Sequence, residues 1–188
     1  MESFFVSMFV VAVGEIGDKT QLLAFMLATR FRRPIPILCG ILAATILNHA
    51  LAGALGALIR AALDPQLLRA LLAISFFAIA LWALKPDTIE GEPRESGRYG
   101  IFAVTAVMFF LAEIGDKTQL ATMALAARYD SLVAVVAGTT LGMLVADAPA
   151  VLFAERIARK IPLRLIRYVS AALFALLGVT AAFMNGKP

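Results

Sequence analysis

The chain has 188 residues, of which 61% are hydrophobic and 16% are charged, and its formal net charge is +4. Soluble domains are about 45–50% apolar, so this composition excludes an ordinary soluble domain and indicates a protein that crosses a membrane several times. Most lysines and arginines stand at the ends of apolar runs, which leaves little positive charge for a nucleic-acid surface. We therefore expect the lipid bilayer as surroundings and no nucleic-acid partner.

Six apolar segments are long enough to cross about 30 Å of hydrocarbon. They run approximately over Phe4–Ala28, Ile35–Ile59, Leu67–Leu84, Ile101–Ala127, Leu132–Phe153 and Leu165–Phe183. The connections between them are short, and the longest, residues 85–98, is rich in charge, proline and glycine and is typical of a solvated linker. The predicted fold class is an all-α membrane protein with six transmembrane helices.

One charged motif occurs twice in the middle of apolar runs. The sequence Glu-Ile-Gly-Asp-Lys-Thr-Gln covers Glu15–Gln21 and returns unchanged as Glu113–Gln119. Each acid or lysine at the centre of a lipid-spanning helix costs roughly 2.5–3.5 kcal/mol. The charges of both copies would together cost about 15–20 kcal/mol if nothing compensated them. Such residues are expected to have a functional partner.

The two copies belong to a longer internal repeat. The offset of 98 residues that aligns them also aligns Arg30 with Arg128 and Phe76 with Phe174. This predicts two three-helix repeats, residues 1–84 and 99–188, joined by the linker 85–98. Because three is odd, the second repeat crosses the membrane in the opposite sense, which is common in secondary transporters with a binding site near the midplane.

The basic residues predict the orientation in the membrane. The first, third and fifth connections carry most of the lysines and arginines outside the motifs. The positive-inside rule then places the linker in the cytoplasm and both termini outside.

The motifs offer hard ligands for a metal ion. If each span is a continuous helix, Glu15 and Asp18 share one face, as do Glu113 and Asp116. The two antiparallel helices would bring these carboxylates together at the same depth. Carboxylate, amide and hydroxyl oxygens suit Ca²⁺, Mn²⁺ or Mg²⁺ and suit soft metals poorly. Additional ligands or supporting residues are expected from Gln21, Gln119, Thr20 and Thr118.

The charge of the motifs fits an exchange of ions. The four carboxylates together with Lys19 and Lys117 sum to −2. A divalent cation neutralises this charge, and two protons would do the same after the ion has left. A bland alternative is that Glu15 and Lys19 form a salt bridge within one helix, as would Glu113 and Lys117. That alternative leaves the two aspartates unexplained.

Three further polar residues lie inside predicted spans. Asn48 is a candidate ion ligand, and Asp147 a candidate proton carrier or supporting ligand. His49 is more often a packing residue in such a place, and a proton-relay role is left open. A membrane hydrolase is disfavoured because the sequence has one histidine and no His-Glu-x-x-His motif. A non-transporting assembly protein also remains as an alternative.

The paired motifs in a six-span chain resemble the Gdt-type calcium/manganese cation exchanger family. The resemblance covers nearly the whole chain. It implies transport of Mn²⁺ or Ca²⁺ against protons, with the ion held by Glu15, Asp18, Glu113 and Asp116. We expect no other cofactor and no enzymatic activity. The short linker and the absence of an N-terminal extension suggest a prokaryotic plasma-membrane member. We expect Mn²⁺ export first and Ca²⁺/H⁺ exchange as the runner-up, and leave open whether the protein forms a homo-oligomer.

Overall fold

The structure is a computed structural model that describes residues 1–85, 100–153 and 163–183. These residues form helices and short connections without any strand, which confirms the prediction of an all-α protein. Apart from Lys85, the predicted linker 85–98 lies outside the described residues. The helices are α1 (Glu2–Glu15), α2 (Lys19–Phe31), α3 (Pro34–Ala62), α4 (Pro65–Ala83), α5 (Ile101–Glu113), α6 (Lys117–Arg128), α7 (Leu132–Leu152) and α9 (Leu163–Ala182).

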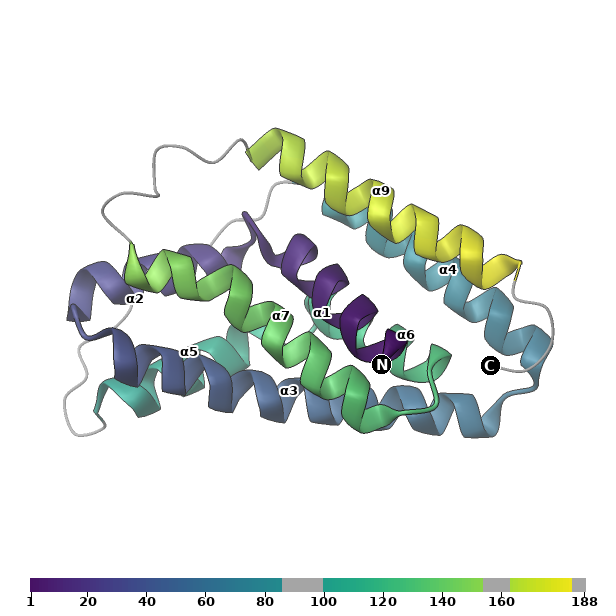
Figure 1. The fold of residues 1–188 in the computed structure, drawn as a ribbon, viewed down its shortest axis with the longest axis horizontal. Coiled ribbons are helices and arrows are strands. Elements are labelled where there is room, and N and C mark those ends of the chain that lie inside the picture. The colour runs from purple at the N-terminus through teal and green to yellow at the C-terminus, as the bar shows by residue number, and fades with distance from the viewer. Residues whose placement is uncertain (86–99, 154–162, 184–188) are drawn as a thin grey trace.

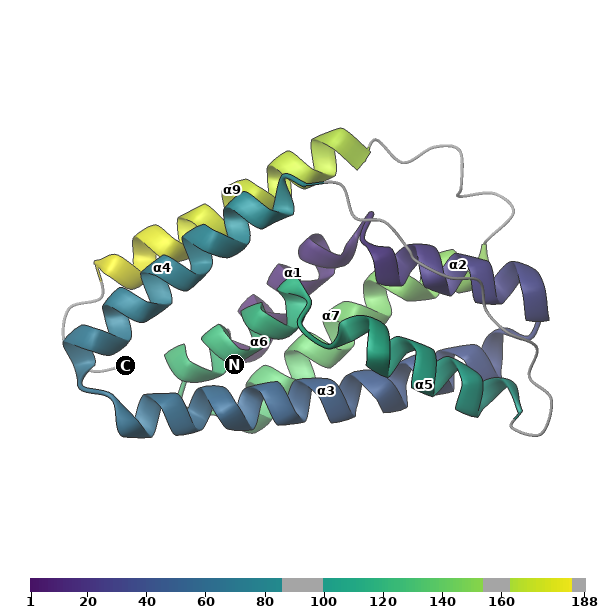
Figure 2. The ribbon, with the colours of Figure 1, turned by 180° about the vertical axis from the view of Figure 1, so that it is seen from behind.

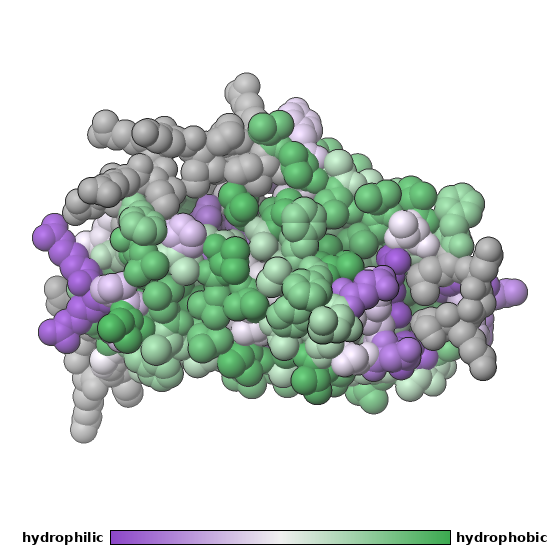
Figure 3. Space-filling model, viewed as in Figure 1, coloured by the Kyte–Doolittle hydropathy of each residue, from purple (hydrophilic) through white to green (hydrophobic). Residues whose placement is uncertain are grey.

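Within the described part of the chain, three helices, α3, α4 and α7, are long and apolar enough to cross a membrane, and Ile101–Glu113 and Arg167–Ala182 form shorter apolar helices. Large apolar side chains such as Leu47, Leu51 and Leu55 on α3 are exposed on the outside of the bundle. Figure 3 shows a broad hydrophobic surface with hydrophilic residues gathered toward the two ends. A surface of this kind is suited to contact with lipid tails.

The first and fourth predicted spans are each divided into two helices. Between α1 and α2, and again between α5 and α6, the helix stops after the glutamate of the motif and restarts at its lysine. The prediction of continuous helices over Phe4–Ala28 and Ile101–Ala127 is therefore wrong. The cause is glycine: Gly17 has φ 80° and Gly115 has φ 73°, a left-handed conformation that glycine adopts freely and a right-handed helix cannot contain.

The divided helices lie along the two long helices of the bundle. Helices α1 and α2 follow α7, α5 and α6 follow α3, and α3 contacts α7 (Figures 1 and 2). Helices α4 and α9 lie side by side and pack against α6 and α1. This arrangement buries the acids beside both helix breaks inside the bundle, although the second turn is itself exposed at Ile114.

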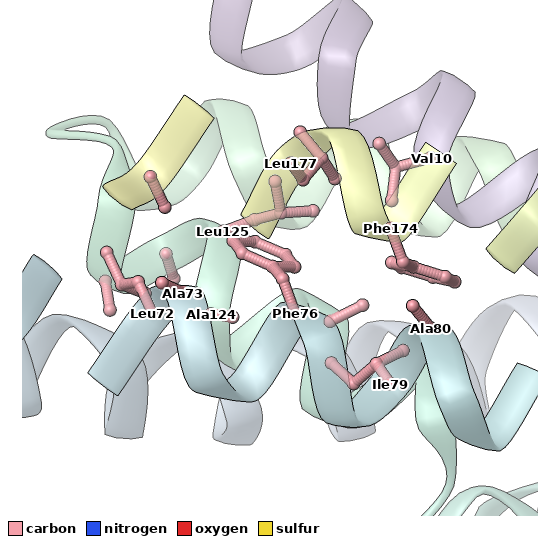
Figure 4. Packing of buried hydrophobic residues seen from close by; sticks show 14 of the residues in the cluster. Val10, Leu72, Ala73, Phe76, Ile79, Ala80, Ala124, Leu125, Phe174 and Leu177 are labelled. Atoms are coloured by element: carbon pink, nitrogen blue, oxygen red, sulfur yellow. The ribbon is translucent and has the colours of Figure 1, made fainter. Parts of the chain in front are cut away.

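Two apolar clusters hold the bundle together on either side of the breaks. The first joins α4 and α9 to the half-helices α1 and α6, and Figure 4 labels Phe76, Phe174 and Leu125 among its members. The second joins the half-helices α2 and α5 to α3 and α7 through residues such as Leu27 and Phe109. Because each divided span contributes one half to each cluster, its break lies between them, where polar residues collect.

Candidate metal centre

Both breaks are built from the same backbone turn. Ile16 has φ −59° and ψ 121°, Gly17 follows with positive φ, and the Asp18 N–H donates to the Glu15 carbonyl at 2.9 Å. These are the torsion angles of a type II turn. The second copy repeats it, with Ile114 at φ −59° and ψ 121°. In each copy the glutamate therefore ends one helix and the aspartate stands at the N-cap position of the next. The Asp18 side chain accepts from the Lys19 N–H at 2.7 Å, whereas the Asp116 side chain makes no capping hydrogen bond.

The glutamine of each motif fastens its own turn. The Gln21 side-chain oxygen accepts from the Gly17 N–H at 2.9 Å, and Gln119 accepts from Gly115 at 2.8 Å. The amide N–H groups point elsewhere: Gln21 donates to the Ala146 carbonyl at 2.8 Å and Gln119 to the Asn48 side-chain oxygen at 3.4 Å. The glutamines thus link the turns to α7 and α3 and so help to fix the positions of the neighbouring carboxylates.

Asn48 also helps to hold the second turn in place, through two hydrogen bonds of its side chain. Its amide nitrogen donates to the Phe110 carbonyl at 3.1 Å, in the last turn of α5. Its oxygen receives the bond from Gln119. Asn48 therefore fixes the position of the second turn relative to α3.

Three of the four predicted carboxylates gather at one point. Glu15, Glu113 and Asp116 are fully buried or nearly so, and each offers an oxygen within 4.8 Å of the others. Oxygens that bind one Ca²⁺-sized cation at 2.3–2.6 Å lie at most about 4.6–5.2 Å apart. The cluster is therefore compact enough for one ion to contact all three residues.

The lysines pair across the repeat. Lys19 lies 2.9 Å from an Asp116 oxygen, and Lys117 lies 2.9 Å from an Asp18 oxygen. The alternative in which each lysine pairs with the glutamate of its own copy is wrong, because the helix break separates those two residues. Asp18 is buried beside Lys117, outside the group of three carboxylates. The sequence contains no sign of this crossed pairing, which depends on how the two turns face each other.

The crossed pairs leave two unbalanced charges, one on each glutamate. Each Lys–Asp pair is neutral, so the net charge of −2 falls on Glu15 and Glu113. Neither oxygen of Glu15 has a hydrogen-bond partner among the described residues. Glu113 accepts a hydrogen bond from the Thr118 hydroxyl, which also lies 3.1 Å from an Asp116 oxygen. Burying an uncompensated carboxylate costs several kcal/mol, so the site favours a cation or protons.

The remaining predicted residues take different positions. The Thr20 hydroxyl is buried and has no hydrogen-bond partner within the described part of the chain. Asp147 is fully buried on α7, and neither of its oxygens has a hydrogen-bond partner among the described residues. It is close enough to Glu15 and Glu113 for the charges of these carboxylates to repel its own. His49 is fully buried on α3, and its Nε2 lies 3.7 Å from Glu113 Oε1.

Comparison with known proteins gives one consistent result. Residues 3–91 and 101–187 match the family model described as "Divalent cation/proton antiporter GDT1", and each matched segment contains one copy of the motif. A Vibrio cholerae protein named "Putative manganese exporter" is 50% identical over 95% of this chain and 89% of that protein. GDT1-like protein 3 of Oryza sativa subsp. indica is 29% identical over 97% of this chain and 74% of its own length. No solved structure matches the chain.

Proposed function

Because the chain belongs to the GDT1 family of divalent cation/proton antiporters, we propose that it exports Mn²⁺ from the cytoplasm in exchange for protons. The observation that carries this proposal is the buried cluster of Glu15, Glu113 and Asp116 between two broken helices. Manganese is the ion named for the Vibrio cholerae relative at 50% identity. The family is one of transporters, in agreement with the expectation that the chain is not an enzyme.

The proposal treats α1 with α2, and α5 with α6, as two broken spans. The protein then has six spans in two inverted repeats, with the linker in the cytoplasm and both termini outside a prokaryotic plasma membrane. Two observations support this. The breaks fall at equivalent positions of the repeat, and discontinuous helices at the repeat interface form the ion sites of many secondary transporters.

In the proposed site, Glu15, Asp18, Glu113 and Asp116 hold the ion, and Lys19 and Lys117 balance the charge. The ion binds when both glutamates are ionised, and protons on the glutamates replace it when it leaves. Asp116 stands in the cluster in this structure and Asp18 stands outside it. If the inverted repeats exchange their conformations, Asp18 takes the place of Asp116 in the state that opens to the other side.

Flux into inside-out membrane vesicles tests the proposal. Vesicles with an acidic interior should take up Mn²⁺ until the pH gradient is dissipated, and Asp18→Asn should abolish the uptake. The matched control is Glu2→Gln, which removes an exposed acid at the start of α1, far from the motif. Uptake that ignores the pH gradient would contradict proton exchange, and normal uptake by Asp18→Asn would contradict the assigned site.

Ca²⁺ is the second candidate ion, because the clustered donors are all oxygens and Ca²⁺ accepts such a ligand set. The same vesicles should therefore be given Ca²⁺ in a parallel assay and in competition with Mn²⁺. A gradient-driven Ca²⁺ flux that excess Mn²⁺ does not reduce would favour Ca²⁺/H⁺ exchange. A non-transporting assembly protein would give neither flux.

A further inference from the structure

His49 has no assigned role in the site, although it lies against it. It is fully buried on α3, and neither ring nitrogen makes a hydrogen bond to any described residue. Buried polar groups almost always have a partner, so an unpartnered imidazole in the middle of a bundle calls for a ligand that the protein itself does not supply. Its Nε2 lies 3.7 Å from an oxygen of Glu113, one of the three clustered carboxylates, and His49 itself stands beside that group rather than within it.

The distance between these two atoms suits a shared cation. At 3.7 Å, His49 Nε2 and Glu113 Oε1 are too far apart for a hydrogen bond. Two donors that bind one ion at about 2.2 Å lie roughly 3.1 Å apart at a right angle and 3.8 Å apart at 120°. We therefore propose that His49 is a ligand of the transported ion and that its ring nitrogen selects Mn²⁺ over Ca²⁺ and Mg²⁺. This inference rests on the proposed export of Mn²⁺ and specifies how the site recognises that ion.

The chemical basis is the difference between nitrogen and oxygen donors. Ca²⁺ and Mg²⁺ bind oxygen ligands almost exclusively, whereas imidazole binds first-row transition metals well. The carboxylates alone accept all three ions. A nitrogen donor in the same set favours Mn²⁺, because replacing an oxygen ligand by imidazole weakens binding of the harder ions.

The repeat provides an internal reference for this assignment. The residue that stands in the place of His49 in the second repeat, 98 positions later, is Asp147, on α7. Asp147 is also fully buried, and its two oxygens also lack a partner among the described residues. The two equivalent flanks of the site thus carry one nitrogen donor and one oxygen donor. The His49→Asp variant would give both flanks an oxygen donor, using a residue that the fold already accommodates at the equivalent place.

Pulsed electron paramagnetic resonance of bound Mn²⁺ tests the contact directly. His49 is the single histidine of the chain, so in protein purified through a histidine-free tag any imidazole coupling to Mn²⁺ arises from it. We expect a nitrogen coupling that shifts when histidine is labelled with ¹⁵N and disappears in His49→Gln. Stoichiometrically bound Mn²⁺ without this coupling would overturn the inference while leaving Mn²⁺ export intact. A protein that neither binds nor transports Mn²⁺ would instead overturn the proposed function.

Ion competition in vesicles tests the selectivity. The concentration of Ca²⁺ that halves Mn²⁺ uptake should fall at least tenfold in His49→Gln and in His49→Asp. Ca²⁺ uptake by the same variants shows that they are folded. In the double variant His49→Asp/Asp147→His the nitrogen donor moves to the other flank, and the preference for Mn²⁺ should return toward the parent value. If Ca²⁺ competes with Mn²⁺ equally well in the parent protein and in both single variants, His49 has no role in selectivity. If the variants are inactive, the nitrogen coupling measured on the parent protein decides whether His49 binds the ion.

Discussion

The two copies of the motif have the same sequence and the same turn, yet they differ in their surroundings. The backbone angles of Ile16 and Ile114 are identical as given, and both glutamines fasten their turns in the same way. The lysines differ: the Lys117 side chain is 5% exposed and the Lys19 side chain 25% exposed. Local sequence therefore determines the turn, and the neighbouring helices determine how each copy is used.

The difference gives the site a closed edge and an open edge. The pair of Lys117 and Asp18 is sealed, whereas the pair of Lys19 and Asp116 adjoins the more exposed turn at Ile114, which is 55% exposed. In a transporter built from two related halves, such asymmetry is expected of a state that opens to one side.

The largest expected effect comes from removing a clustered carboxylate. Glu15→Gln and Glu113→Gln should each lower Mn²⁺ uptake by roughly 100-fold or more, because loss of a direct ligand exceeds the 10–100-fold effect of supporting residues. Both variants keep the size of the side chain, and vesicle flux measures the result. If the two variants lose very different amounts of Mn²⁺ uptake, the two glutamates do not contribute equally, and the copies then differ in ion binding as well as in their surroundings.

The lysines provide the next test, through stability. Lys117→Met leaves Asp18 as a buried charge without this partner, and breaking a buried pair in that way costs about 3–5 kcal/mol. Lys19→Met should cost a similar amount although Lys19 is 25% exposed, because the partner it leaves behind, Asp116, is only 1% exposed. Thermal unfolding in detergent at fixed pH would compare them. The double variant Lys117→Met/Asp18→Asn should recover most of the loss, and no recovery would show that the pair itself is not the source.

The turn glycines predict a smaller loss. A side chain at Gly115 would meet nothing within 4 Å, so Gly115→Ala tests the backbone angle alone. Forcing a non-glycine residue into this left-handed conformation costs about 1–2 kcal/mol. We expect that loss of stability together with weaker Mn²⁺ binding, measured by titration. Gly115→Asn should be milder because asparagine tolerates the conformation, and equal damage by both substitutions would point to something other than the torsion angle.

Much of this arrangement could be predicted from the sequence. The composition indicated an all-α membrane protein, and the repeated motif singled out Glu15, Glu113 and Asp116, which the structure brings together. The helix breaks were missed, although a glycine followed by an N-capping aspartate is a signal that one helix ends and another begins. The crossed pairing of the lysines could not be predicted, because it depends on tertiary contact between turns 98 residues apart in the chain.

The smallest expected effect concerns the hydrogen bond that the glutamine of each turn donates to a neighbouring helix. Gln119 donates to the side chain of Asn48, whereas Gln21 donates to the backbone carbonyl of Ala146, which no substitution removes. Asn48→Ala should therefore loosen the second turn alone. A hydrogen bond of this kind contributes about 1 kcal/mol, so Mn²⁺ binding should weaken roughly fivefold. The control is Ala146→Ser, at the equivalent position of α7, which keeps the carbonyl and should bind Mn²⁺ normally. A loss as large as that of Glu113→Gln would mean that Asn48 itself contacts the ion.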